Sequence, residues 1–509
     1  MKQKILALLV LAAMVLTLGQ SLQAEAAQTD ADAKPQEQEA TLISTMRSVK
    51  SHSGFQDVSV IWDDVLNKSL ASKDTASLTL EHSEGIGSLY FFYQYPYEVG
   101  YTVTDNATGQ SFIAGKYGFL HDFVDLVAMF GYAPSSVTVT YPHGKVHICE
   151  LRLYSPGTPP ADVQRWKPPA EHKADLLLFS THGDDEQLFF AGVLPYYAKA
   201  LGYNVQVVYL TDHRNLTTSR VHEMLNGMWS VGCDVYPVFG SFPDFLKETI
   251  SSTYSEFKAY GYTRSDILDY CTEQLRRFKP KVVVAHDFNG EYSHGQHMVY
   301  ADCVAEALTA ASDPAKMPHS AELYGTWDTP KAYFHLYWEN ILVMDWDTPM
   351  EELDGLSPFQ VTQKYGFPCH KSQLWTWFSG WINGKNGVKI TKASQIATYS
   401  PCLYGLYRST VGPDVEKKDF FENVTTHAQD DALWLEQNPQ LPPNIPPETT
   451  GPEPTTPQAT QGPEATAPQA YEPPAETRSE TSQILLISAL VVLSLLVCVL
   501  ILLLFLRFK

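Results

Sequence analysis

The sequence lacks the signatures of two common kinds of zinc protein. It has no His-Glu-x-x-His motif, which weakens the case for a zinc peptidase, and its seven cysteines include no C-x-x-C pair. A zinc site made of thiolates is therefore not expected. Basic residues are also few, with 36 Lys and Arg against 57 Asp and Glu and a net charge of -21. Because neutralisation of phosphates supplies most nucleic-acid affinity, nucleic acid is not an expected partner.

Charge is absent from residues 484–506, a stretch long enough to cross a bilayer as a helix. Arg507 and Lys509 follow it and predict a cytoplasmic tail at 507–509. A cleaved lipid-anchor signal is the alternative, and the basic final residues argue against it. At the other end, a basic start, a short apolar run and small residues at Ala24 and Ala26 predict a cleaved signal peptide over residues 1–26. An uncleaved anchor is the alternative there. We expect a single-pass cell-membrane protein with an extracellular ectodomain.

Aliphatic residues are nearly missing from residues 436–482, which are rich in Pro, Thr, Glu and Gln. Such a segment cannot bury enough surface to fold, and proline keeps it extended. We predict a disordered stalk there and a polar linker at residues 27–41.

Residues 42–157 are predicted to form an all-β, sandwich-like accessory domain. Short alternating or aromatic-rich runs, such as SLTLEH, SLYFFYQY and SVTVTY, are separated by turn-forming residues. The aromatic residues between Tyr90 and Tyr97 have two interpretations, a platform for sugars or the core of the sandwich, and the core is the one that we favour.

From Ala174 onward apolar runs alternate with helical segments. ADLLLFS, NVQVVYLT, CDVYPVFG and KVVVAH are typical of strands buried on both faces, and helices are expected between them. This alternation predicts an α/β domain over residues 170–435, with a mostly parallel sheet and helices on both faces. In such sheets sites form beyond the carboxyl ends of the strands, where polar clusters follow three of these runs.

The first of these clusters runs from His182 to Glu186, directly after ADLLLFS. A histidine with two adjacent carboxylates suits zinc, which accepts imidazole nitrogen and carboxylate oxygen. Since neighbouring residues do not easily aim at one ion, one aspartate is left to face a bound water. The same residues at a helix start would instead cap the helix and interact with its dipole. Both interpretations stay open for this cluster alone.

The second cluster follows KVVVAH and runs from His286 to His297. It holds three histidines and two carboxylates ahead of an apparent helix, MVYADCVAEAL. His294 and His297 are three residues apart, so they can share one face of a turn or helix. Because both clusters follow strands of one sheet, we expect them to meet at one metal site.

These motifs resemble those of the PIG-L/LmbE-like zinc de-N-acetylases, which remove acetyl groups from N-acetylglucosamine-type amines. The family's His-Pro-Asp-Asp-Glu motif stands here as residues 182–186, and its closing His-x-x-His as His294 and His297. Residues 220–223 (RVHE) and 370–373 (HKSQ) resemble two further motifs. The resemblance covers about half of the chain and implies a Rossmann-like fold for the α/β domain.

The resemblance also implies a role for each matched residue. His182, Asp185 and His297 would hold zinc, with ferrous iron as the alternative metal in vivo. Asp184 would act as the general base on the metal-bound water. His294 would stabilise the oxyanion or protonate the leaving amine.

Two further residues are implied as substrate contacts, and three positions depart from the family pattern. Arg220 and His370 would bind the substrate. Gly183 replaces the usual proline, which is expected to loosen the turn, and Gly295 and Gln296 replace a Pro-Asp pair. None of the departures falls on an expected ligand.

The predicted function is therefore a membrane-anchored, zinc-dependent hydrolase that releases acetate from an N-acetylated glycan or glycoconjugate. The alternative is a catalytically silent, membrane-tethered glycan-binding protein. Loss of a metal ligand or of Asp184 would distinguish it, and neither is missing.

Overall fold

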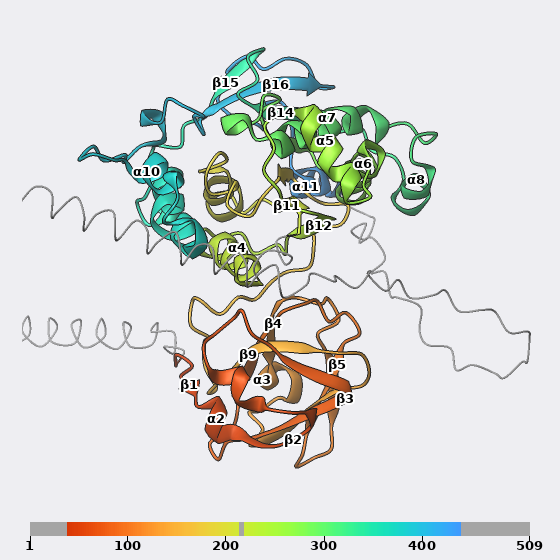
Figure 1. Ribbon diagram of the computed structural model, residues 1–509, viewed down its shortest axis with the longest axis vertical. Helices are drawn as coiled ribbons and strands as arrows, with labels where there is room; N and C mark the ends of the chain where they lie inside the picture. Colours follow the sequence, from red (N-terminus) through yellow and green to blue (C-terminus); the bar gives the residue numbers. More distant parts are fainter. Residues whose placement is uncertain (1–37, 213–217, 439–509) are drawn as a thin grey trace, which may run out of the picture. The chain divides into compact units, whose positions relative to one another are not determined.

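The computed structural model describes residues 38–212 and 218–438, which form a β-rich domain followed by an α/β domain (Figure 1). The predicted signal peptide, most of the linker, nearly all of the stalk, the membrane helix at 484–506 and the tail lie outside the described residues. Among the helices that are described, none is long and apolar enough to cross a membrane. The six cysteines of the described part are free thiols, and five of them are buried.

The β-rich domain contains nine strands arranged around β3. β3 pairs with β9 at its start and with β2 and β8 farther along, so it joins two groups of strands. The strands are β1 (Leu42–Ile43), β2 (Val49–Phe55), β3 (Leu70–Glu81), β4 (Ser88–Tyr93), β5 (Tyr101–Asp105), β6 (Ser111–Ala114), β7 (His121–Asp125), β8 (Ser136–Tyr141) and β9 (His147–Tyr154). Short helices α2 (Thr45–Ser48), η1 (Val58–Trp62) and α3 (Leu126–Phe130) connect them.

The two groups of strands enclose one apolar core, as expected for a sandwich. Phe91 on β4 contacts Tyr101 on β5 with ring centroids 5.5 Å apart, although β4 and β5 are not paired. Every residue of β4 is buried, including Tyr90 at 1% and Phe92 at 4% exposure. The core interpretation is therefore confirmed for the aromatic residues of β4 and for Tyr97, which is 6% exposed, whereas Tyr95 is 43% exposed and lies at the surface.

The α/β domain is built on a seven-stranded sheet in the order β12-β11-β10-β13-β14-β16-β15. The first five strands are parallel, and β16 runs antiparallel to both of its neighbours. The predicted, mostly parallel sheet is confirmed. Its strands are β10 (Leu176–Ser180), β11 (Val205–Thr211), β12 (Val238–Phe242), β13 (Val282–Ala285), β14 (Lys331–His335), β15 (Ile341–Val343) and β16 (Leu403–Ser409).

Helices cover both faces of this sheet, as the alternating sequence predicted. On β10, Leu177 and Phe179 pack in a core with α5, α6 and α7, whereas Leu176 and Leu178 face α4. The helices are α4 (Thr218–Ser230), α5 (Ile250–Ala259), α6 (Arg264–Phe278), α7 (Gly295–Ala310), α8 (Pro318–Tyr324), α9 (Pro358–Val361), α10 (Trp377–Asn383) and α11 (His427–Gln437). Single turns of 3-10 or π type are η2 (Pro195–Ala200), η4 (Glu291–Ser293), η5 (Glu351–Leu353), η6 (Thr362–Gly366), η7 (Phe367–Cys369), η8 (Lys371–Gln373) and η9 (Ala393–Gln395).

The helix predicted directly after β10 is irregular. Residues 183–192 form successive turns, and a regular element begins only with the π-type turn η2. Gly192 has φ +98°, and a Cβ there would lie 2.6 Å from the Trp346 ring. Left-handed backbone at a position too crowded for a side chain interrupts a helix, so this segment stays a compact series of turns.

The β-rich domain contacts α4 through buried polar residues, which we call the boundary cluster: His121, Gln164, His222 and Asn226. His121 Nδ1 donates to Gln164 Oε1 at 2.6 Å, and its Nε2 accepts from His222 Nδ1 at 2.7 Å. Gln164 Nε2 in turn donates to Asn226 Oδ1 at 2.6 Å. The β-rich domain is therefore joined to a helix of the α/β domain by specific hydrogen bonds.

Candidate metal centre

The first motif follows β10 at the carboxyl edge of the sheet, where the pattern placed it. His182, Asp184 and Asp185 are 4%, 3% and 1% exposed. The backbone N–H of His182 donates to Asp185 Oδ2 at 2.8 Å. This bond closes a tight turn and holds the Asp185 carboxylate beside the His182 ring.

Gly183 packs tightly within this turn. A Cβ at this position would lie 2.0 Å from Met224 Sδ on α4, so a larger residue fits only if the Met224 side chain moves. The absent side chain lets Met224 of α4 pack directly on the motif. The expectation that glycine loosens the turn stays a prediction.

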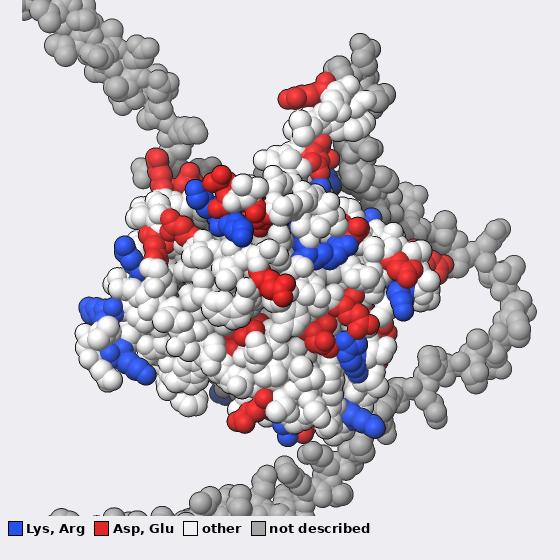
Figure 2. Space-filling model, turned by 90° about the horizontal axis from the view of Figure 1, so that it is seen from above, with Lys and Arg blue, Asp and Glu red and all other residues white. Residues whose placement is uncertain are grey.

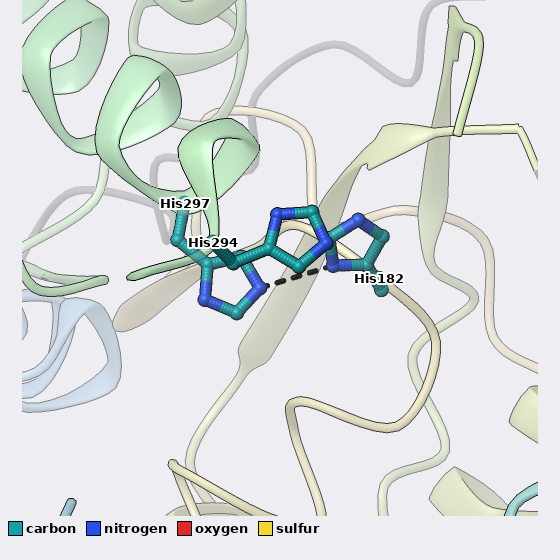
Figure 3. Close-up of side chains that lie close together, drawn as sticks. All are labelled: His182, His294 and His297. Carbon is teal, nitrogen blue, oxygen red and sulfur yellow. Dashed lines mark hydrogen bonds between the residues drawn. The ribbon is translucent and has the colours of Figure 1, made fainter. Parts of the chain in front are cut away.

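Three side-chain atoms converge on one point. His182 Nδ1 lies 3.0 Å from His297 Nε2 and 3.2 Å from Asp185 Oδ2, and the latter two atoms are 3.3 Å apart. Figure 3 shows the rings of His182 and His297 facing each other, one from the loop after β10 and one from the first turn of α7. Two bonds of about 2.0–2.2 Å at a tetrahedral angle place ligand atoms about 3.3–3.6 Å apart. The structure therefore brings the three predicted ligands to nearly the spacing that one zinc ion needs.

Two other histidines lie close enough to be considered as ligands, His286 and His294. His286 is already used at both nitrogens: Nδ1 donates to Glu291 Oε2 at 2.9 Å, and Nε2 accepts from the Thr181 N–H at 3.0 Å. His294 Nδ1 accepts from the Gln296 N–H at 3.2 Å and caps α7. The proton of the neutral His294 ring therefore lies on Nε2. A protonated nitrogen has no lone pair to offer a metal ion, so His294 is a hydrogen-bond donor and not a ligand.

Glu291 accepts hydrogen bonds from the histidine nitrogens that face away from the metal centre. The sequence placed it in the second polar cluster but assigned it no role. Its Oε2 accepts from His297 Nδ1 at 2.6 Å, and its Oε1 accepts from His335 Nδ1 at 2.5 Å. A carboxylate on the outer nitrogen fixes the tautomer of a metal-binding histidine and raises its basicity. Tyr292 and Ser293 follow with φ of +45° and +61°. Such backbone costs about 1–3 kcal/mol per residue, a strain typical of functional sites.

Gln296 and Asp244 orient His182 from the opposite side. Gln296 Oε1 lies 3.2 Å from His182 Nε2, and Gln296 Nε2 donates to the Pro243 carbonyl at 2.8 Å. Asp244 Oδ1 lies 3.5 Å from the same His182 nitrogen. These contacts favour a proton on Nε2 of His182. The unprotonated Nδ1 of His182 is then the atom that faces Asp185 and His297. Gln296 had been noted only as a departure from the family pattern, and no local pattern marked Asp244.

The electrostatics of the ligands favour a cation. Burial alone would lower the pKa of His297, but the neighbouring Asp185 carboxylate raises that pKa to about 10. Burial would raise the pKa of Asp185, yet His297 and His182 hold it well below its usual value. The carboxylate therefore stays ionised, and a metal cation takes the place of the proton that otherwise sits among these atoms.

Asp184 is not among the three converging ligand atoms, and its carboxylate contacts α4. Its Oδ2 lies 3.3 Å from Arg220 NH2, and Arg220 NH1 lies 3.8 Å from Asp244 Oδ2. Burial raises the pKa of Asp184 despite the opposing charge of Arg220. A buried carboxylate with a raised pKa is a stronger base than an exposed one, which suits proton abstraction.

The two predicted substrate residues have different surroundings. Arg220 is held between Asp184 and Asp244, at the edge of the metal centre. His370 is fully buried, with Nε2 3.0 Å from Glu186 Oε1. Burial would lower the pKa of His370, but Glu186 raises it. His370 therefore lies behind the motif, and its substrate contact stays a prediction.

Comparisons with known proteins agree with this arrangement in the α/β domain. Residues 177–308 match the sequence profile of the family described as PIG-L, GlcNAc-PI de-N-acetylase. The 1D-myo-inositol 2-acetamido-2-deoxy-alpha-D-glucopyranoside deacetylase 1 of Catenulispora acidiphila is 27% identical over 198 residues, which are 34% of this chain and 60% of that protein. Deacetylase 2 of the same description from Saccharopolyspora erythraea is 34% identical over 98 residues, 19% of this chain and 34% of that protein. The chain thus spans less than two thirds of these relatives.

A solved structure was also matched, the N,N'-diacetylchitobiose deacetylase from Pyrococcus horikoshii. It is 14% identical, and the match covers 45% of this chain and 82% of that one with a TM-score of 0.32. A TM-score of this size adds nothing to the description of the fold, which rests on the strand order and pairings given above.

Proposed function

We propose that this chain, in which residues 177–308 form a domain of the PIG-L family, is a zinc-dependent hydrolase that removes the N-acetyl group from an N-acetylglucosamine-type sugar. The observation that carries the proposal is the convergence of His182 Nδ1, Asp185 Oδ2 and His297 Nε2. The names of the relatives, which are deacetylases of an acetamido sugar, support the choice of substrate class.

The donor set fits zinc as a catalytic ion. Two imidazole nitrogens and one carboxylate oxygen are the ligands of a three-residue zinc site, whose remaining position is open to water or substrate. When bound, zinc lowers the pKa of its water to about 7 and polarises the amide carbonyl. Ferrous iron accepts imidazole and carboxylate ligands as well and is the alternative metal.

Asp184 is the general base in this proposal. It neighbours the ligand Asp185 in sequence but is not one of the three converging ligands, so it can take a proton from the attacking water while Arg220 contacts its Oδ2. It accepts the proton of that water and returns it to the amine nitrogen as the C–N bond breaks, which releases acetate. Arg220 keeps this carboxylate oriented, and its contact with the sugar is a further expectation.

His294 stabilises the oxyanion that forms at the acetyl carbon. Its Nδ1 accepts from the Gln296 N–H, so its Nε2 carries a proton and can donate. Burial lowers the pKa of His294, and the nearby His182 and His297 lower it further. A neutral donor is therefore maintained at neutral pH, and donors of this kind are worth about 10²–10³ in rate.

The proposal includes a location and a natural substrate, and both depend on residues outside the described ranges. The signal-like start and the apolar, uncharged stretch near the carboxyl terminus support a membrane-anchored protein with its catalytic domain outside the cell. Glycans or glycoconjugates of the cell surface are the substrates that such a location offers.

Acetate release by the purified full chain from a panel of N-acetylglucosamine glycans tests the proposal. Activity should disappear after chelation and return when zinc or ferrous iron is added. A protein that binds metal at one equivalent but releases acetate from no member of the panel would favour the silent glycan-binding alternative.

A further inference from the structure

One segment of this acidic chain contains no acidic residue. Residues 355–413 hold no Asp or Glu, although the chain as a whole has a net charge of -21. The basic residues of the segment are Lys364, Lys371, Lys385, Lys389, Lys392 and Arg408. At the left margin of Figure 2, the side on which α10 lies in Figure 1, Lys and Arg side chains stand largely apart from acidic ones.

The same segment exposes two tryptophans, and one of them, Trp377, lines a groove. Trp375 is 83% exposed and Trp377 is 49% exposed. A cavity of about 840 Å³ is lined by Trp377, Trp381, Lys385 and Lys389, among others. A neighbouring cavity of about 490 Å³ shares Lys389 and adds Lys364. We call these two cavities together the α10 groove. Its larger part lies within the ~300–1,000 Å³ typical of ligand sites.

Aromatic side chains connect the wall of the α10 groove with the metal centre. The ring of Trp377 lies 5.6 Å from that of Tyr292, which lies 5.4 Å from His294. A second path runs from Trp381 to Phe189 at 5.6 Å and from Phe189 to His297 at 5.8 Å. A ligand in the groove is therefore separated from the metal ligands by a single layer of side chains.

The lysines of the groove are available to a ligand. Lys364, Lys385 and Lys389 are exposed, and no ion pair joins them to a carboxylate within the described ranges 38–212 and 218–438. The segment also lies outside residues 177–308, the part matched by the family profile. The groove is thus a feature of this chain beyond the matched family domain.

We propose that the α10 groove binds the flanking units of an anionic polysaccharide whose N-acetylated sugar occupies the metal centre. This inference rests on the proposed function and narrows its substrate class. Tryptophan rings offer large apolar faces for the C–H faces of sugar rings, and lysine ammonium groups attract carboxylate or phosphate along the polymer. The acidic remainder of the chain repels such a polymer and directs it to this one basic segment.

Three hexamers of equal length test the proposal on the full chain. One alternates N-acetylglucosamine with glucuronic acid, one is N-acetylglucosamine 1-phosphate, and one is neutral N-acetylglucosamine. Dissociation constants and kcat/KM for acetate release are measured for each. We expect at least one anionic hexamer to exceed the neutral one by about tenfold or more, the lower range of electrostatic focusing effects. The anionic hexamer with the higher affinity and kcat/KM then shows whether the groove prefers carboxylate or phosphate groups in its polymer.

Matched variants locate the effect. Lys385→Gln combined with Lys389→Gln should bring the anionic-to-neutral ratio close to one. Lys73→Gln combined with Lys145→Gln, which removes two exposed lysines from the β-rich domain, should leave the ratio unchanged. Trp377→Ala should weaken the binding of all three hexamers by the same factor. Trp338 is 65% exposed and does not line the groove, so Trp338→Ala is the control and should leave binding unchanged.

The outcomes separate the two proposals. Equal kcat/KM and equal affinity for all three hexamers would overturn the inference while leaving the deacetylase function intact. A ratio that survives the Lys385 and Lys389 changes would also overturn it. Acetate release from none of the hexamers by zinc-loaded protein would instead count against the proposed function.

Discussion

Two groups of buried histidines lie on either side of α4, and they use their ring nitrogens differently. In the boundary cluster, both nitrogens of His121 are taken up by hydrogen bonds to Gln164 and His222. In the metal centre, one nitrogen each of His182 and His297 is oriented by Gln296 or Glu291, and the other converges with Asp185. Complete pairing among neutral groups marks a structural histidine, whereas convergence on a shared point beside a carboxylate marks a ligand.

The electrostatics of the two groups follow the same division. Burial lowers the pKa of His222 to about 4, and burial together with His222 lowers that of His121 well below its usual value. The pKa values of His182 and His297 are raised instead, because carboxylates outweigh the effect of burial. One α-helix separates the groups: His222 is two residues from Arg220 and from Met224, which places it about 200° away around α4.

The largest expected effect comes from breaking the converging set. Asp185→Ala should abolish metal binding and lower kcat/KM by at least about 10³-fold, because both the ion and its activation of water are lost. Elemental analysis of the purified protein and acetate release measure the two losses. Retention of stoichiometric metal in this variant would show that Asp185 is not a ligand.

Removing the charge behind His297 should have a smaller effect. Glu291→Gln keeps the shape but weakens the hydrogen bonds to His297 and His335, and metal affinity should fall about 10–100-fold. Competition with a chelator of known affinity measures this change. Asp287→Asn, four residues earlier in the same loop, is the control and should bind metal as the unaltered protein does.

Crowding the turn between the motif and α4 should affect stability. Gly183→Ala places a Cβ against Met224 Sδ, and overpacking of this kind typically costs about 1–3 kcal/mol in the free energy of unfolding. Gly380→Ala meets its nearest neighbour, Lys385 Cβ, at an ordinary 3.6 Å and serves as the control. Chemical denaturation of both variants measures the difference, and equal stabilities would contradict the tight packing of α4 on the motif.

The smallest effect concerns pH and the boundary cluster. The folded pKa of His222 is about 4, below the unfolded value near 6.5. The unfolded state therefore takes up a proton first as pH falls, and this group removes up to ~3 kcal/mol of stability between pH ~6.5 and ~4. Unfolding free energies of His222→Gln should lack this component of the pH dependence, while its metal content stays unchanged. Metal loss in this variant would mean that the boundary cluster is part of the metal centre.

The sequence was sufficient for the features that depend on local pattern. Apolar runs marked β10, β11 and β13, and the polar residues after them marked the edge where His182, Asp185 and His297 meet. The irregular turns after β10 were not predicted, because they depend on how Gly192 packs against the distant Trp346.

The supporting residues of the site were missed for a similar reason. His335 ends a strand that looks like any other buried strand, and its contact with Glu291 spans 44 residues. The hydrogen bond between His121 and His222 spans 101 residues and joins two domains. Contacts of this kind arise from the fold as a whole and leave no mark on the neighbouring sequence.

The central claim is that two adjacent aspartates have separate tasks, and Asp184→Asn tests it most directly. The account predicts that this variant keeps its metal at the level of the unaltered protein, because Asp185, His182 and His297 are untouched. Acetate release should fall about 10²–10⁴-fold through loss of the general base. Metal content and acetate release are measured on the same preparation of the full chain. Full activity, or loss of metal together with activity, would contradict the account.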